Sequence, residues 1–419
     1  MSKKEDIQKQ EIPIMSKFMG LHAINSFADK DSASRAQMLG QHISQTLPLC
    51  DGDPRIIQNG TDMMFSKHTF KRKISCKARI IATIPRYRLG MEKGGVNSIT
   101  EVIVIYLNLD ENKYDHVSLP SYSDMHSYFG FEYKWDEKKL QKLRPGTIIE
   151  EETILADSPT VKDGDKYCFG ATMNVVSVSH PGVAEDAVII RRGAIPKLRF
   201  KVYEKRAISV SATKVLANLY GDENNYKPLP NIGEKIHSSG MICLSRELDI
   251  MSAPILFSKK GLMKYNIMFD EANYSRDSNG VVKDIKIYRN PTSKKAPLTG
   301  TTDFLDSYSK ALVTFHQEII DVYEDLEKDG KQLGKSAPTY SPKFHALVVE
   351  SLGIVYGDGP DGISTPIKKL FKKDPIDLYR VEIVVEHELS INHGYKLTNL
   401  HGKLKIIWFI LLNCPAIRN

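Results

Sequence analysis

Two stretches of the chain, KARIIATI at residues 77–84 and SITEVIVIYLNL at residues 98–109, decide the class of fold. Both are dense in β-branched residues, which favour strands because their side chains pack well on a pleated surface. The segment between them, RLGMEKGGVN at 88–97, contains three glycines and is typical of a loop. The pattern therefore predicts strands joined by a glycine-containing loop within residues 73–107.

Other elements are predicted on both sides of these strands. Further strands are expected at 147–155 and 174–190, and YRVEIVVEHEL at 379–389 is the clearest strand in the second half. Residues 29–45 begin with Asp and Ser cap candidates and predict a short helix, one side of which is kept small by Ala33, Ala36, Leu39 and Gly40. The segment CDGDPRIIQNGTD at 50–62 has the composition of turns.

Between residues 195 and 380 the pattern changes to short strands, Gly/Pro turns and one strong helix. Within 303–328, where Thr302 or Asp303 is the expected cap, apolar residues recur every three or four positions, as on the buried face of a helix. These residues are Leu305, Tyr308, Leu312, Phe315, Ile319, Val322 and Leu326. The predicted class is α+β and β-rich.

Composition sets broad limits on function. With 41% hydrophobic and 26% charged residues the chain is typical of a soluble globular protein, and 58 Lys+Arg against 51 Asp+Glu, a net charge of +7, permits a polyanionic partner without requiring one. The five cysteines contain no CxxC pair, so reduced thiols are expected rather than a zinc ribbon or a disulfide framework. The N-terminal MSKKEDIQKQE is not a secretory signal, and IIWFILL at 406–412 is too short to span a bilayer. A cytoplasmic location is expected.

Several short motifs have a structural and a functional interpretation. The acidic DGD at 51–53 and DGPDG at 358–362 could supply Mg²⁺ ligands, but Gly and Pro beside Asp favour turns. His387, His393 and His401 do not form HExxH, and no Walker A or GxGxxG sequence is present. The basic KHTFKRKISCKAR at 67–79 fits a solvated strand face best, with phosphate contact as the alternative.

Three stretches resemble, in the same order, segments of the β (second-largest) subunit of multisubunit DNA-dependent RNA polymerases. They are SFADKDSASRAQMLGQHISQTLP at 26–48, then ILADSP at 154–159 with PGVAEDAVII at 181–190, and SINHGYKLTNLHG at 390–402. In the first stretch eight positions are identical to the family: Phe27, Asp31, Ala33, Arg35, Ala36, Met38, Gln45 and Pro48. Weaker similarity at 230–247 and 278–290 extends the resemblance over most of residues 20–402.

The resemblance implies the double-psi β-barrel portion of a β subunit with a flap-like insertion. The implied segments are a fork-like helical segment at 1–60, a hybrid-binding and barrel part at 61–195, a flap-like (wall) insertion at 196–380, a returning barrel strand and loop at 381–402, and an atypical tail at 403–419. Similarity begins in mid-subunit, as in the split β subunits of giant bacteriophage polymerases. The implied location is then the cytoplasm of an infected bacterial host.

The resemblance also implies roles for individual residues. Arg35 matches the arginine that contacts the triphosphate of the incoming nucleotide, Lys396 matches a lysine that reaches the RNA 3′ end, and Gln45 matches a residue near the RNA in the hybrid site. Glu185 and Asp186 match the acidic pair near the second, nucleotide-borne Mg²⁺. The alternatives are an ion pair of Arg35 with Asp31 one helical turn earlier and a solvent-facing loop position for Lys396.

The implied activity is shared with other subunits. The NADFDGD motif, which holds the catalytic Mg²⁺ on the β′ subunit in this family, does not occur in the chain. The implied partners are β′-like subunits, an N-terminal β-like subunit, DNA template, RNA transcript, NTPs and a promoter-specificity subunit, with no membrane. The implied function is nucleotidyl transfer as a polymerase subunit that is inactive alone.

The C-terminal tail departs from the family. After HG the family reads NKGV, with a second phosphate-contacting lysine, whereas Leu404 occupies that position here. We expect residues 403–419 to be a truncated tail that packs poorly, because no barrel strand pattern receives its apolar run. Two other functions remain open: a non-catalytic assembly module that docks on polymerase partners, and a stand-alone basic nucleic-acid-binding protein.

Overall fold

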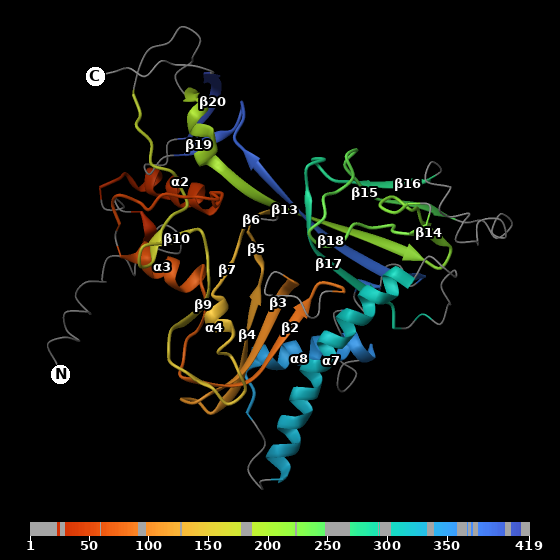
Figure 1. The fold of residues 1–419 in the computed structure, drawn as a ribbon. Coiled ribbons are helices and arrows are strands. Elements are labelled where there is room, and N and C mark those ends of the chain that lie inside the picture. The colour runs from red at the N-terminus through yellow and green to blue at the C-terminus, as the bar shows by residue number, and fades with distance from the viewer. Residues whose placement is uncertain are drawn as a thin grey trace, which may run out of the picture.

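The computed structural model shows a mixed α and β chain that is rich in strands (Figure 1). It describes residues 23–411 apart from 26–29, 59, 91–97, 126–127, 177–186, 223, 248–268, 292, 294–302, 333–338, 358–366, 368–369, 372–375 and 399–403. For residues 329–332, 398 and 404–411 only the backbone is described. The predicted α+β, strand-rich class is confirmed.

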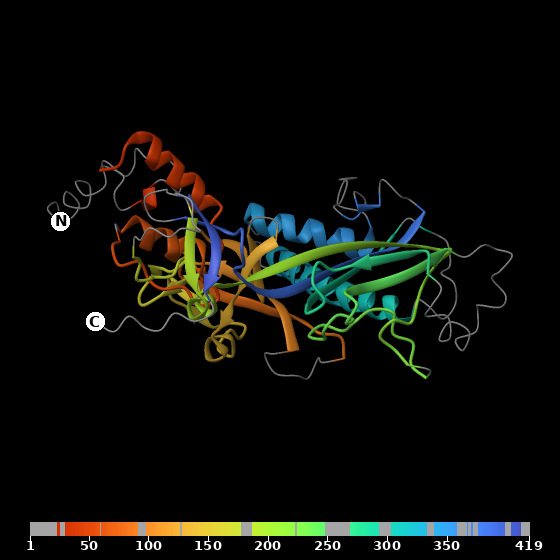
Figure 2. The same ribbon diagram turned by 90° about the horizontal axis from the view of Figure 1, so that it is seen from above.

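The longest sheet is built around two long antiparallel strands (Figures 1 and 2). Its strands, in order across the sheet, are β17 (Val281–Arg289), β18 (Asp377–Ser390), β13 (Arg199–Ser211), β6 (Phe129–Glu132) and β5 (Tyr122–Met125). β13 pairs with β18 from one end to the other, and β18 contains the strand predicted at 379–389. The sheet thus joins strands from three of the segments that the resemblance implies.

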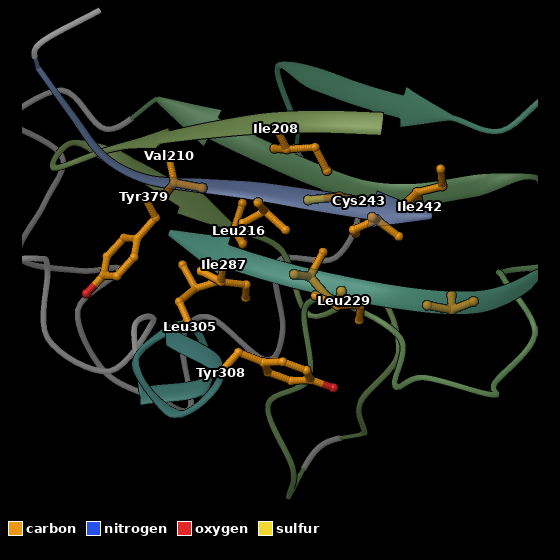
Figure 3. Close-up of a cluster of buried hydrophobic side chains, with 14 of the residues drawn as sticks. Ile208, Val210, Leu216, Leu229, Ile242, Cys243, Ile287, Leu305, Tyr308 and Tyr379 are labelled. Atoms are coloured by element: carbon orange, nitrogen blue, oxygen red, sulfur yellow. The ribbon is translucent and has the colours of Figure 1, made fainter. Parts of the chain in front are cut away.

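One face of this sheet carries the largest hydrophobic core (Figure 3). Ile208 and Val210 of β13, Val381 of β18 and Ile287 of β17 are buried there, because side chains alternate between the two faces of a strand. Part of the core comes from a smaller sheet of β14 (Lys214–Leu216), β15 (Met241–Glu247) and β16 (Glu271–Tyr274). Leu305 and other residues from the first turns of the long helix close it (Figure 3).

The strands predicted within 73–107 form a second sheet, and that prediction is confirmed. Its order is β4 (Lys113–Pro120), β3 (Ile99–Asn108), β2 (Ala78–Tyr87) and β8 (Ile148–Ile149). Ile84, Ile103 and Ile105 pack against two helices, α7 (Asp303–Gln332) and α8 (Pro342–Tyr356).

The apolar stripe predicted on α7 is buried, apart from the half-buried Val322. Asp303 is the first residue of the helix, and Thr302 lies outside the described residues. Helix α8 was not predicted from the sequence, which indicated one strong helix in this region. The signal was present, because Ser341 caps the Phe344 amide, Pro342 follows, and Gly357 ends the helix in the left-handed conformation.

A buried ion pair ties the two main sheets together. The guanidinium of Arg86 on β2 donates to both carboxylate oxygens of Asp284 on β17, at 2.9 and 2.8 Å, and lies 3.5 Å from Glu101 on β3. Burial by itself would raise the pKa of Asp284, but the Arg86 charge and hydrogen bonds lower it below its ordinary value. Both partners therefore stay charged inside the protein, where an unpaired charge would be strongly unfavourable.

The N-terminal part agrees with the sequence in outline. α2 (Ala33–Ser44) lies within the predicted 29–45 and buries Ala36, Leu39 and Gly40, whereas Ala33 is exposed. Residues 50–58 lack regular structure as predicted, except for single bridges, but the last two residues of the predicted turn region begin an unpredicted helix, α3 (Thr61–Thr69). This helix packs beside β11 (Lys166–Tyr167). A small antiparallel sheet contains β1 (Arg72–Ile74), β9 (Thr153–Asp157) and β7 (Lys134–Trp135), and α4 (Glu137–Leu140) follows β7 in the chain. A second small sheet pairs β10 (Val161–Lys162) with β11.

A three-stranded sheet places the C-terminal segment between two partners. β20 (Leu404–Leu411) pairs in parallel with β12 (Ala187–Arg191) and antiparallel with β19 (Lys396–Thr398). The expectation that no strand pattern receives the apolar tail is therefore wrong for 404–411, because its backbone is the central strand of this sheet. Of the strand predicted at 174–190, only its end is observed, in β12; residues 171–176 are irregular and 177–186 lie outside the described residues.

Because β20 is the central strand of this sheet, removing it is expected to destabilise the chain. A chain ending at Gly402 loses the central strand and exposes the edges of β12 and β19, and exposed edges favour association. We expect its free energy of unfolding to fall by a few kcal/mol, since each net backbone hydrogen bond contributes about 0.5–1.5 kcal/mol. Thermal unfolding and light scattering of both forms at matched concentration check this. A more stable and more monodisperse short form would show that β20 does not support the sheet.

No helix in the described ranges is long and apolar enough to cross a membrane. Four cysteines, Cys50, Cys76, Cys168 and Cys243, are free thiols, as the sequence predicted for them. Cys414 lies outside the described residues.

Candidate functional site

The three stretches that resemble the polymerase family meet in one hydrophobic cluster. Leu47 comes from the first stretch, Val188 and Ile190 come from the second, and Ile391 and Leu397 come from the third. Figures 1 and 2 agree that α2 lies beside the sheet that contains β19 and β20. Segments that are more than 300 positions apart in the printed sequence are thus held side by side by shared apolar burial.

A second cluster connects α2 to the remaining part of the resemblance. Leu39 and Ile43 on the buried face of α2 belong to the same cluster as Ala156 of the ILADSP segment. Phe70, Tyr167 and Phe169 fill the cluster with closely spaced rings, whose centroids are 4.7–6.3 Å apart. The opposite face of α2, which carries Arg35, is left in solvent.

Lys396 is the first residue of β19 and is exposed. The next residue, Leu397, packs into the cluster that unites the three stretches, so Lys396 points to the other face of the sheet. Lys396 is opposite Ile406, which is in turn opposite Ala187. Two strand spacings therefore separate Lys396 from Ala187, about 10 Å. Glu185 and Asp186, which directly precede Ala187, lie outside the described residues.

Arg35 lies on the exposed face of α2. Its guanidinium Nη1 is 3.5 Å from the sulfur of Met38, and within the described part of the chain no carboxylate lies within ion-pair distance of it. Asp31, the alternative partner one turn earlier, accepts a hydrogen bond from Asn25 at 3.3 Å. Gln45 is the exposed C-terminal cap of the same helix. Arg35 and Gln45 thus present polar groups to solvent from two ends of α2.

The basic cluster at 67–79 is largely neutralised by carboxylates of the same chain. Lys73 and Lys67 contact Glu152 at 2.6 and 3.0 Å, and Lys71 contacts Asp165 at 2.6 Å. A further pair joins Lys77 to Glu150 at 3.2 Å, and Arg72 lies over the ring of Tyr133. The lysines thus hold the strands of this region together, and their charge is partly compensated, whereas Arg79 is exposed.

The acidic DGD turn is structural as well. Asp51 pairs with Lys162, and Asp53 accepts the Thr172 amide at 2.9 Å while its own amide bonds to Gly170. A Cβ on Gly52 would lie 1.9 Å from the carbonyl oxygen of Cys168, so the chain needs glycine here. The turn interpretation is confirmed for 51–53; the second acidic motif, 358–362, lies outside the described residues.

A serine, a histidine and a glutamate also meet beside the longest sheet. His387 Nε2 is 2.9 Å from the Ser275 hydroxyl and 3.3 Å from the Glu204 carboxylate, and Ser275 donates to Glu204 at 2.7 Å. A catalytic relay needs the hydroxyl and the carboxylate on different ring nitrogens. Here both lie at Nε2, so the cluster is a buried hydrogen-bond network that joins β13, β18 and the segment after β16. His393 is on a turn, and His401 lies outside the described residues.

Among the described residues no group of three or more His, Cys, Asp or Glu side chains could hold a metal ion. The chain matches no protein-family model. A functional assignment therefore rests on the residues themselves and on where the fold places them.

Proposed function

We propose that this chain is a β-type subunit fragment of a DNA-directed RNA polymerase. It contributes to NTP binding, RNA 3′-end positioning and hybrid binding in template-directed RNA synthesis. The observation that carries the proposal is the shared cluster of Leu47, Ile190 and Leu397, because it unites three stretches that were singled out from sequence alone. Chance similarity between short stretches gives no reason for them to be neighbours in space.

The chemistry of the exposed groups fits this role. Nucleotidyl transfer depends largely on positioning and on stabilising negative charge. In the proposal, Arg35 binds the nucleotide triphosphate with its planar fork, and Lys396 gives a compact cationic contact near the RNA 3′ end. Gln45 lies near the RNA. Both cations are exposed, as a partner that is not part of this chain requires.

Mg²⁺ enters the proposal mainly through another subunit. A β′-like partner holds the catalytic ion, which supplies charge stabilisation at the reacting phosphate. Glu185 and Asp186 are the only residues of this chain that the proposal places near a nucleotide-borne Mg²⁺. No step of the reaction is assigned to a metal held by this chain.

The finer architecture is part of the same proposal. The sheet of β12, β20 and β19 belongs to the double-psi β-barrel portion, and the smaller sheet of β14, β15 and β16 with α7 and α8 belongs to the flap-like insertion. The parallel pairing of β12 with β20 supports it, because it brings the AVII residues of the PGVAEDAVII stretch next to the segment after HG. The setting is the cytoplasm of an infected bacterial host, with β′-like and N-terminal β-like subunits, a promoter-specificity subunit, DNA, RNA and NTPs as partners.

Reconstitution tests the proposal. The chain is co-expressed with candidate β′-like and N-terminal β-like subunits, and the complex is assayed for extension of an RNA primer on a template. Stable assembly and extension that depends on this chain are expected. Assembly without extension would favour the docking-module alternative, to which Leu404 at the position of the family lysine lends weight, since it is paired with Thr398 inside the sheet. Failure to assemble would overturn the polymerase assignment.

Without partners, the purified chain is expected to synthesise no RNA with any template and NTP mixture, because the aspartates that hold the catalytic metal in this family are not in its sequence. Primer extension resolved on a gel checks this. Extension by the purified chain alone, retained through a further purification step, would contradict the subunit assignment.

A further inference from the structure

We infer that the outer face of the β12–β20–β19 sheet binds a phosphodiester backbone, with Lys396 at one end and Arg191 at the other. Arg191 and its neighbour Arg192 have no role in the family resemblance. The identification of the bound nucleic acid as RNA rests on the proposed function. The geometry of the binding face comes from the sheet itself.

The strand register places both cations on the same face. In β12, Val188 and Ile190 turn toward the hydrophobic cluster, so Ala187, Ile189 and Arg191 turn away from it. In β19, Leu397 turns toward the same cluster and Lys396 turns away. Because the two strands flank β20 in one sheet, Lys396 and Arg191 project from the same side.

The spacing between Lys396 and Arg191 suits a nucleic-acid strand that crosses the sheet diagonally. Lys396 is level with Ala187, two strands away, and Arg191 is four residues further along β12, opposite Leu411. With about 3.3 Å per residue and about 4.8 Å between strands, the two backbone positions are roughly 16 Å apart. The two cations are therefore too far apart to share one phosphate and would contact different phosphates of the same nucleic-acid strand.

Among the described residues, the cations of this face have no carboxylate partner, unlike the lysines at 67–79. Arg191 and Arg192 are exposed, and in the described ranges neither lies within ion-pair distance of a carboxylate. The 3-10 turn η5 (Arg192–Leu198) continues with Lys197, whose ammonium lies 4.0 Å from Asp53. Within the described residues Lys396 likewise lacks a carboxylate partner. A polyanion is the class of ligand that such a face attracts.

This site has only a weak signal in the sequence. Two arginines directly follow the apolar VII run, but an Arg-Arg pair at a strand end is common on solvated surfaces. The basic stretch at 67–79 is the more prominent one in the sequence. Only the placement of β12 beside β19 shows that Arg191 shares a face with Lys396.

The test measures binding of a fluorescently labelled single-stranded RNA oligonucleotide to the full chain by anisotropy at stepped salt concentrations. Arg191→Ala and Lys396→Ala are each expected to weaken binding several-fold and to flatten the slope of log affinity against log salt by about 0.7, the contribution of one phosphate contact on a single strand. The double variant should flatten it by about twice as much. Matched controls are Arg144→Ala and Lys310→Ala, which remove exposed cations from other parts of the chain.

Several results would overturn the inference. These are no binding by the unmodified chain, or equal slopes for Arg191→Ala and Arg144→Ala. A third is displacement of RNA by an oligoglutamate of matched charge at equal concentration, which would indicate an acidic protein segment as the occupant. Circular dichroism melts of each variant confirm that the fold is kept. Because this measurement needs no partner subunit, it can fail while assembly and RNA synthesis succeed, or hold while assembly fails.

Discussion

Replacing Arg86 with alanine is expected to lower the free energy of unfolding by about 3–5 kcal/mol, because it leaves the buried carboxylate of Asp284 without its partner. Chemical denaturation at neutral pH measures this. The matched control is Arg199→Ala, which breaks an arginine–carboxylate pair with Glu388 at 2.5 Å that is about half exposed, at 48% and 45%. Such surface pairs contribute only about 0.2–1 kcal/mol.

The two forms should also differ in pH dependence. In the unmodified chain the pKa of Asp284 is lowered by Arg86 against the opposing effect of burial, so this contribution is complete above the ordinary Asp pKa and is lost as the pH falls below it. In Arg86→Ala, burial raises the pKa of Asp284 against only the weaker lowering effects of Lys286 and the Ile285 amide. The folded form then takes up a proton more readily, and the destabilisation shrinks as the pH is lowered from neutral. A penalty below 1 kcal/mol that does not vary with pH would show that the pair does not hold the two sheets together.

In a reconstituted polymerase, Arg35→Ala is expected to reduce kcat/KM for NTPs by roughly 30- to 1,000-fold, or about 2–4 kcal/mol, through loss of a charged contact to the triphosphate in a site that excludes water. Single-nucleotide addition at varied NTP concentration measures it. Arg35→Lys keeps the charge and loses the fork, so partial recovery is expected.

The control for this experiment is Arg144→Ala, which removes an exposed arginine outside α2. The stability of the isolated chain should not change with Arg35→Ala, since the side chain is exposed and its described contact is the Met38 sulfur. If NTP use equals that of the Arg144 control, Arg35 is a surface residue of α2 and the nucleotide lies elsewhere.

Elements with a local signal could be predicted from the amino-acid sequence. The β-branched runs predicted β2, β3 and β18, because the residues that favour a strand are consecutive in the sequence. The apolar stripe specified α7, and the Gly and Asp residues at 51–53 specified a turn. Even α8 had a local signal in its Ser-Pro cap and its terminal glycine, although its apolar run has little polar face to mark it as amphipathic.

Which of these elements are neighbours could be seen only in the folded chain. β20 pairs with β12, which lies more than 200 positions earlier in the chain, and the residues of the apolar tail do not predict this partner. Whether a basic residue is free depends in the same way on distant carboxylates: Lys73 is neutralised by Glu152, whereas Arg191 stays exposed. Strand propensity and charge are properties of single residues, whereas pairing, burial and charge compensation depend on residues that the fold brings together. The face shared by Lys396 and Arg191 therefore forms only when the chain folds.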